Sequence, residues 1–169
     1  MPIKITSIIG NRDNCQKIAE QAGIPFHHIN LDGDNKESGF QQIKTILKEE
    51  DVELTVLARF MQILPTWFCE QYSGKIINIH HSFLPSFKGA RPYHQAHTKG
   101  VKLIGATAHY VTGDLDEGPI IEQAVEKIDH NFDIDELVQI GRDAECAAFA
   151  RAVKWHCEHR IIVNGNKTV

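Results

Sequence analysis

Two short apolar runs separated by a helix-like segment restrict the fold of this chain more than any other feature. Residues 54–60 form a nearly continuous apolar run, and residues 75–80 form a second one, in which polar groups begin at Asn78. Between the runs, Pro65 is placed to begin a short helix and Gly74 to end it. Continuous apolar runs are typical of parallel strands that are buried on both faces. The pattern therefore predicts two strands joined by a helix.

The same alternation continues along the whole chain. Strands are predicted at residues 3–9, 24–30, 104–111 and 119–128, and helices at 13–22, 40–50, 92–99 and from a cap at Asp133 or Asp135 onward. Residues 32–38 are predicted as a loop, and the tail at 161–169 as strand-like with an Asn164–Gly165 turn. Alternating strands and helices indicate an α/β fold, a Rossmann-like open and mostly parallel sheet with flanking helices. The length of 169 residues corresponds to a single domain, residues 1–169.

Composition excludes several classes of protein. The net charge is −4, and Lys and Arg do not cluster, so a nucleic-acid-binding surface is not expected. The start of the chain has too short an apolar stretch for a signal peptide, and no run approaches a membrane span, so no membrane partner is expected. The four cysteines form no CxxC pair and have no zinc-finger spacing. These features predict a reduced, cytoplasmic protein.

The end of the run at 75–80 is a candidate site of carbonyl chemistry. Asn78 and His80 are two residues apart, so their side chains share one face of a strand. An amide can donate to a developing oxyanion, and an imidazole can move a proton near neutral pH. The alternative is a strand whose polar residues only mark where it meets water. Ser82 is a weak nucleophile candidate with nothing to activate it, so an external amine or water is the expected nucleophile.

The turn at residues 112–118 places three carboxylates within four residues after a predicted strand. It is too short for a calcium-binding EF-hand loop, so no metal is expected. One of its carboxylates is predicted to reach His80 and hold its tautomer, and the alternative is a solvated acidic turn without chemistry. His109 follows the strand pattern near this turn and is a candidate supporting residue.

Several segments together resemble the folate-dependent formyltransferase family. The similar segments are residues 57–65 (LARFMQILP), 77–80 (INIH) followed by 82–89 (SFLPSFKG), and 105–123 (GATAHYVTGDLDEGPIIEQ). The double histidine His80–His81, residues 90–96 and the closing residues 165–169 are most similar to the hydrolytic branch of that family. The resemblance covers nearly all of the chain and implies a formyltransferase-like sheet.

The resemblance also implies a reaction and its residues. The reaction is hydrolysis of 10-formyltetrahydrofolate to tetrahydrofolate and formate, a step of one-carbon metabolism connected with purine biosynthesis. The implied catalytic residues are Asn78, His80 and Asp116. The implied substrate-binding residues, which hold the pterin largely through backbone groups, are Met61, Gln62, Ile63, Leu64, Thr112, Gly113, Asp114 and Leu115. No cofactor or metal is implied; the implied partners are the folate substrate and further copies of the chain in a homo-oligomer.

Two alternatives stay open beside hydrolysis. One is formyl transfer to an amine of the glycinamide-ribonucleotide type, and the other is a folate-binding domain without catalysis. The family's hydrolytic members also begin with a small regulatory domain and a first strand–helix unit, and residues 3–9 match the second strand. The resemblance therefore implies a catalytic domain truncated at its N-terminus, in which a central strand is missing or supplied in another way.

Overall fold

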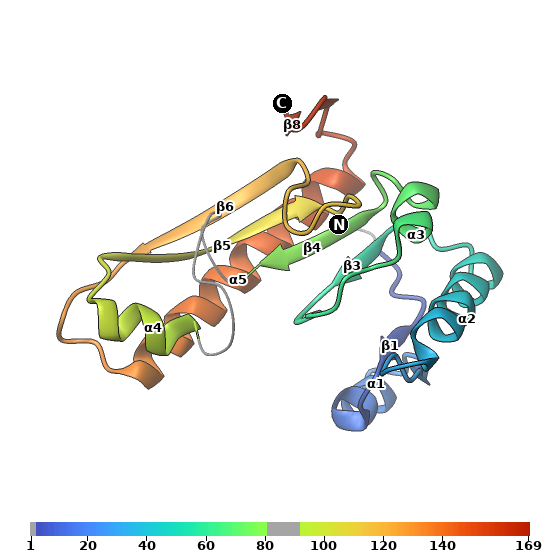
Figure 1. Cartoon of the computed structure of the whole chain (residues 1–169), viewed down its shortest axis with the longest axis horizontal. Coiled ribbons are helices and arrows are strands. Elements are labelled where there is room, and N and C mark those ends of the chain that lie inside the picture. Colours follow the sequence, from blue (N-terminus) through green and yellow to red (C-terminus); the bar gives the residue numbers. More distant parts are fainter. Residues whose placement is uncertain (1–2, 81–91) are drawn as a thin grey trace. The chain divides into compact units, whose positions relative to one another are not determined.

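The computed structural model describes residues 3–80 and 92–169 of the chain. The chain divides into two compact units, Met1–Leu54 and Thr55–Val169. Each unit combines strands with helices, which confirms the predicted α/β fold class (Figure 1). The single domain over residues 1–169 stays a prediction.

The first unit contains a parallel pair of three-residue strands. Ile8 lies opposite Phe26 in this pair. The elements, in chain order, are β1 (Ile8–Gly10), the 3₁₀ helix η1 (Asp13–Cys15), α1 (Gln16–Gln21), β2 (Phe26–His28) and α2 (Asn35–Glu49). Helix α2 buries Phe40, Ile43 and Leu47, which recur every three or four residues along one side.

Three predictions for the first unit need correction. Both strands are shorter than the predicted runs at 3–9 and 24–30. Helix α2 begins at Asn35, inside the predicted loop, because its first turn faces solvent and so carries no apolar signal. Asp13 lies in η1 and provides no side-chain cap for α1.

The second unit contains a four-stranded sheet in the order β3-β4-β5-β6. Strands β3 and β4 are parallel, whereas β4–β5 and β5–β6 are antiparallel (Figure 1). The elements are β3 (Thr55–Leu57), α3 (Thr66–Gln71), β4 (Ile76–His80), α4 (Pro92–Lys99), β5 (Leu103–Tyr110), β6 (Ile120–Lys127), α5 (Ile134–Cys157), β7 (Val163–Asn164) and β8 (Lys167–Thr168). Pro65 precedes α3 and Gly100 follows α4 with a positive φ, as predicted. The predicted strand at 54–60 is shortened to three residues, and Val56 is 45% exposed rather than buried.

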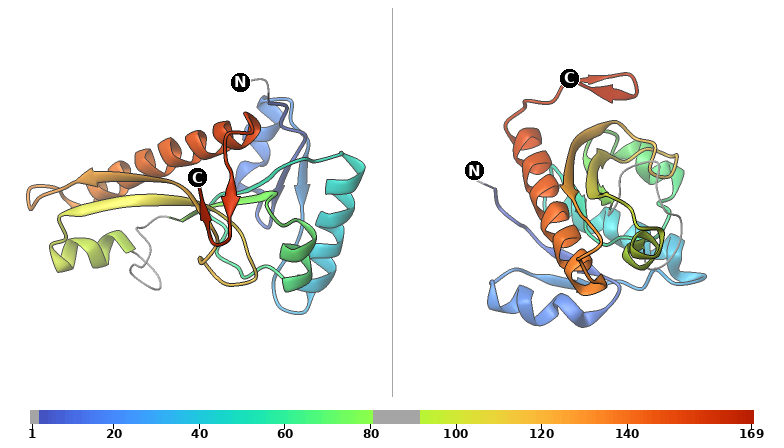
Figure 2. Two further views of the ribbon diagram at one scale, coloured as in Figure 1. Left: turned by 90° about the horizontal axis from the view of Figure 1, so that it is seen from above. Right: turned by 90° about the vertical axis from the view of Figure 1, so that its left-hand side faces the viewer.

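Helix α5 runs along one face of this sheet (Figure 2). Tyr110 Oη lies 2.7 Å from His156 Nδ1, and Arg151 pairs with Glu122 at 3.2 Å, so Tyr110 and Glu122 point toward α5. Side chains alternate between the two faces of a strand. Thr107, His109 and their neighbours on β4 therefore occupy the opposite face, which α5 leaves open for other contacts.

Helix α5 and the tail show how local sequence sets the ends of elements. Asp133, rather than Asp135, is the N-cap: its carboxylate accepts from the Glu136 N–H at 2.8 Å, and the Glu136 carboxylate accepts from the Asp133 N–H at 2.9 Å. In the tail, β7 and β8 form a hairpin whose loop is Gly165–Asn166 rather than Asn164–Gly165. Only the first loop residue, Gly165, has a positive φ, which is the type II′ pattern.

Candidate functional site

Strand β4 presents two polar side chains between buried apolar ones. Ile77 and Ile79 are 0% and 9% exposed and lie opposite Tyr110 and Ala108 on the face toward α5. Asn78 and His80 alternate with them and are half-buried on the other face. The strand thus holds an amide and an imidazole side by side on a rigid element, as the sequence predicts.

The turn at residues 112–118 brings Asp116 to this face. Asp116 Oδ2 lies 3.4 Å from His80 Nδ1, and its Oδ1 lies 3.7 Å from His109 Nε2. A parallel arrangement of β4 and β5 would place the start of the turn at the carboxyl end of β4, and the structure differs from this. Because β5 is antiparallel, its carboxyl end lies beside Ile77, near the start of β4. The turn reaches His80 only because it folds back over the sheet.

Two backbone features make this folding back possible. Asp116 has φ +57°, a left-handed conformation that Asp adopts more readily than most residues. A Cβ built on Gly118 would lie 1.7 Å from the Tyr110 carbonyl oxygen, so only glycine lets the turn approach β5 so closely. Strained backbone is often found where a side chain must be held in place for function.

His109 is a further residue of the site. It lies directly opposite Asn78 in the β4–β5 ladder, and Asn78 Nδ2 is 3.3 Å from His109 Nε2. The ring is 2% exposed, and its Nδ1 is 2.9 Å from the Tyr110 carbonyl oxygen. Asn78 Oδ1 is buried and accepts no hydrogen bond from any residue in the described ranges. A buried acceptor without a partner costs about 1–3 kcal/mol.

Thr107 and Gln123 extend the polar face, and the sequence alone did not identify them. Thr107 lies opposite His80 on one side and opposite Gln123 on the other. Gln123 Nε2 donates to Thr107 Oγ1 at 3.0 Å, and Thr107 is fully buried. The alternation of polar residues at 107 and 109 was visible in the sequence, but the register that aligns them with β4 was not.

The predicted substrate-binding residues form two segments of the second unit. A Cβ built on Gly113 would lie 3.8 Å from Thr66 Cγ2, so the turn passes close to the start of α3, which the segment 61–64 precedes. Three large apolar side chains on these segments are exposed: Met61 at 74%, Ile63 at 57% and Leu115 at 62%. Exposed apolar side chains of this kind are suited to cover a flat ring.

The remaining predicted residues of these segments are less distinctive. Gln62 and Leu64 are half-buried, and Thr112 Oγ1 donates to the Asp114 carbonyl at 3.2 Å. Ser82, His81 and the other motif residues at 81–91 lie outside the described residues. Among the described residues, no group of three His, Cys, Asp or Glu side chains is arranged to hold a metal ion.

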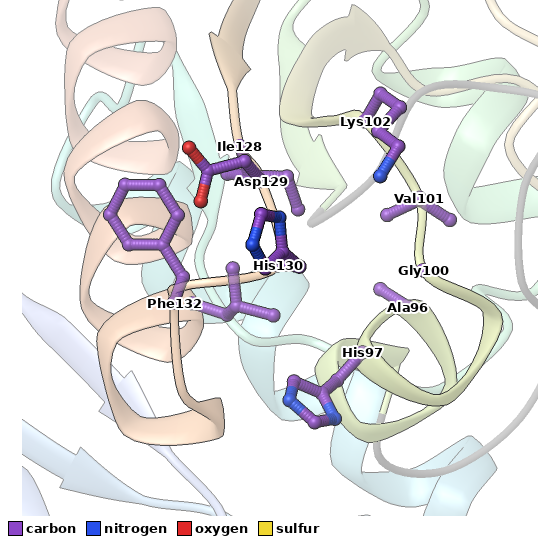
Figure 3. A pocket seen from close by; sticks show the side chains of 10 residues that line it. Ala96, His97, Gly100, Val101, Lys102, Ile128, Asp129, His130 and Phe132 are labelled. Atoms are coloured by element: carbon purple, nitrogen blue, oxygen red, sulfur yellow. The ribbon is translucent and has the colours of Figure 1, made fainter.

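A separate cavity lies in the second unit, away from the predicted residues. It measures about 180 Å³ and is lined by Val101, Ile128 and Phe132, with charged or titratable side chains such as Lys102 and His130 at its rim (Figure 3). None of its lining residues belongs to the predicted site. No described helix has both the length and the apolar character needed to cross a membrane.

Comparison with known proteins agrees with this geometry. A family model described as "Formyl transferase" matches residues 1–153. The chain is 48% identical over 169 residues to the formyltetrahydrofolate deformylase of Corynebacterium sp. (strain P-1) and 49% identical over 166 residues to that of Bacillus subtilis (strain 168). These two matches include 100% and 98% of this chain, but only 59% and 55% of the relatives. The chain therefore spans less than two thirds of their length.

Solved structures give the same picture. A formyltetrahydrofolate deformylase from Burkholderia mallei matches with a TM-score of 0.94 at 49% identity, over 99% of this chain and 59% of that one. A phosphoribosylglycinamide formyltransferase from Anaplasma phagocytophilum matches with a TM-score of 0.87 at 36% identity, over 98% of this chain and 80% of that one. These matches confirm the formyltransferase-like architecture and the resemblance found in the sequence. The chain belongs to the formyl transferase family.

Proposed function

We propose that this chain hydrolyses 10-formyltetrahydrofolate to tetrahydrofolate and formate. The observation that carries the proposal is the convergence of Asn78, His80 and Asp116 on one face of the sheet, with Asp116 Oδ2 3.4 Å from His80 Nδ1. The two curated relatives compared above and the Burkholderia structure are named as formyltetrahydrofolate deformylases, which supports the choice of reaction.

In the proposed mechanism, water attacks the formyl carbon and the carbonyl oxygen becomes an oxyanion. Asn78 donates a hydrogen bond to that oxygen and stabilises the tetrahedral intermediate. His80 takes a proton from the water, and Asp116 keeps its ring in the required tautomer and stabilises the imidazolium. When the bond between the formyl carbon and N10 breaks, His80 returns the proton to N10. Formic acid leaves and loses its own proton to solvent.

We place the pterin between the segments that carry Met61–Leu64 and Thr112–Leu115. The exposed apolar side chains of Met61, Ile63 and Leu115 would cover its ring, while backbone groups of both segments pair with its polar edge. Such a site binds the substrate through parts that do not react, and it leaves the formyl group beside Asn78 and His80.

Formyl transfer to an amine is the second candidate, because the chain covers 80% of a phosphoribosylglycinamide formyltransferase. The same side chains would serve an amine nucleophile as well as water. Incubation with 10-formyltetrahydrofolate, with and without glycinamide ribonucleotide, separates the two. Hydrolysis gives formate at the same rate in both reactions. Transfer gives a formylated ribonucleotide when glycinamide ribonucleotide is present and little formate when it is absent.

The substitution His80→Ala tests the proposal directly. It should abolish formate release while folate binding changes no more than a few-fold. His130→Ala, which removes an exposed histidine from the separate cavity, is the matched control and should keep full turnover. Near-full turnover by His80→Ala rejects the catalytic assignment. Folate binding without turnover in the unsubstituted chain would favour a non-catalytic binding domain.

We further propose that residues 1–169 act as one catalytic domain, in the cytoplasm and as a homo-oligomer. The four cysteines are all free thiols, which suits a reducing compartment. A single cooperative unfolding transition supports one domain, and sedimentation equilibrium measures the oligomeric state.

A further inference from the structure

The position of one proton on His109 follows from its surroundings. His109 Nδ1 lies 2.9 Å from the carbonyl oxygen of Tyr110. A carbonyl oxygen can only accept, so Nδ1 must carry the proton of this hydrogen bond. His109 Nε2 is therefore an acceptor when the ring is neutral and a donor when the ring is an imidazolium.

The partner of Nε2 determines which end of the Asn78 amide is used. With a neutral ring, Asn78 Nδ2 donates to Nε2 across 3.3 Å, and Asn78 Oδ1 is left buried without a donor among the described residues. In this arrangement the Asn78 N–H group donates to His109, although the proposed mechanism needs it for the formyl oxygen. The same arrangement also leaves a carbonyl, which repels an oxyanion, at the end of the amide that points away from His109.

An imidazolium reverses both features. The two ends of an amide are interchanged by a half-turn that leaves its heavy atoms in place. After that half-turn, His109 Nε2–H donates to Asn78 Oδ1, and the Asn78 N–H group is no longer used by His109. Asp116 Oδ1, 3.7 Å from His109 Nε2, provides the negative charge that stabilises the imidazolium.

We propose that His109 is a positioning residue whose protonated form turns the Asn78 amide so that its N–H group faces the formyl oxygen. This inference rests on the hydrolysis proposed above and refines it. Asp116 then has two roles through its two oxygens, since Oδ2 meets His80 and Oδ1 meets His109. His109 itself does not touch the substrate.

The charged groups around His109 are few in the described part of the chain. Asp116, from the turn, and His80, from β4, face it on the same side of the sheet. Glu122 on β6 is paired with Arg151 on the opposite face. His156, on α5, also lies on the opposite face, where it binds Tyr110. A change of charge at His109 is therefore balanced by Asp116.

Two substitutions of similar size test the role of the ring. His109→Gln keeps a side chain that can donate but removes the titration, and His109→Leu removes both. The turnover number of His109→Leu should fall about 100-fold, which is typical for loss of an oxyanion donor, while KM changes only a few-fold. His109→Gln should retain more activity than His109→Leu. His156→Gln, a histidine on the other face of the sheet, is the matched control and should leave turnover unchanged.

The pH profile separates positioning from a structural role. Because the proposed active form holds a protonated His109, the turnover number of the unsubstituted chain should fall at high pH. In His109→Gln the alkaline fall should disappear. If His109→Gln keeps the alkaline fall, or if the two variants lose activity equally, His109 is only structural and the inference is overturned.

Nuclear magnetic resonance of the unsubstituted chain gives a readout that needs neither turnover nor a folded variant. With histidine nitrogens labelled, both nitrogens of His109 should be protonated in the complex with a carbon analogue of the formyl folate that cannot lose its formyl group. An unprotonated Nε2 in that complex overturns the inference while formate release still upholds the proposed function. Absence of formate release with both nitrogens protonated rejects the proposed function and leaves the orientation of the amide supported.

Discussion

Gly118→Ala should disable the site without removing any functional group. The alanine Cβ would lie 1.7 Å from the Tyr110 carbonyl oxygen and 2.8 Å from its carbonyl carbon, both backbone atoms of a central strand. Real Cβ contacts are essentially never under 3.0 Å. Because β5 is paired on both sides, the turn at 112–118 rather than the strand has to move, by about 1.3 Å.

The magnitude follows from what the turn carries. Asp116 is two residues from Gly118, and its oxygens lie 3.4 Å from His80 and 3.7 Å from His109, so a shift of this size breaks one contact or both. Misplacement of a catalytic group by about 1 Å can lower a rate about 100-fold. Overpacking of this kind also lowers the free energy of unfolding by about 1–3 kcal/mol.

The assay measures formate release and urea unfolding on the same samples. Gly141→Ala is the matched control, because its Cβ would lie 2.1 Å from Tyr93 Oη, between α4 and α5 and away from the turn. It should lose comparable stability and keep its turnover number. If Gly118→Ala folds and turns over at near the unsubstituted rate, the turn does not position Asp116 and the reasoning is refuted.

Three shorter predictions concern charge, packing and pH. Asp116→Asn should lower the turnover number about 10- to 100-fold with little change in KM, because the neutral amide cannot stabilise an imidazolium at His80; unchanged steady-state kinetics would remove Asp116 from the mechanism. Tyr93→Phe should lower the free energy of unfolding by about 1 kcal/mol in urea titration, because the 2.9 Å hydrogen bond from Tyr93 to Glu145 is lost. Glu145→Gln keeps an acceptor for Tyr93 and should retain most of that free energy. An equal loss of free energy in the two variants would argue against the hydrogen bond. Burial lowers the pKa of His156, so the unfolded chain takes up its proton first; the stability from a neutral His156 should be fully present above pH ~6.5 and be lost as pH falls through the lowered pKa. Thermal unfolding of His156→Gln across that range should show a weaker dependence, and an identical dependence would contradict this account.

The sequence predicted best those elements whose signals are local. Pro65 and Gly100 mark ends of helices through fixed or positive φ angles, and Asp133 caps α5 through hydrogen bonds within one turn. The face shared by Asn78 and His80 follows from the period of a strand alone. Each of these features is decided within a few residues, so no knowledge of the rest of the chain is needed.

Features that depend on pairing between strands were missed or wrong. The direction of β5 relative to β4 cannot be read from either run, so the sequence did not show that the turn at 112–118 begins beside the start of β4. Val56 looked like a buried residue because an apolar run does not reveal whether a neighbour covers it. Thr107 gained its role only through the register that sets it opposite His80, and the same register gave His109, already a candidate, its partner Asn78.

The register of β5 against β4 is fixed by packing on the face of the sheet toward α5, which holds none of the proposed catalytic residues. Ala106 and Ala108 on β5 are fully buried, and so are Ala148 and Ala152 on α5, so the helix lies close to the sheet and larger side chains at these positions would push it away. A slip of β5 by one residue would turn Thr107 and His109 toward α5 and bring alanines beside Asn78. Such a slip would bury a hydroxyl and an imidazole in a close-packed layer of alanines, where hydrogen-bond partners are scarce. The packing of small residues under the sheet therefore determines which polar groups meet above it.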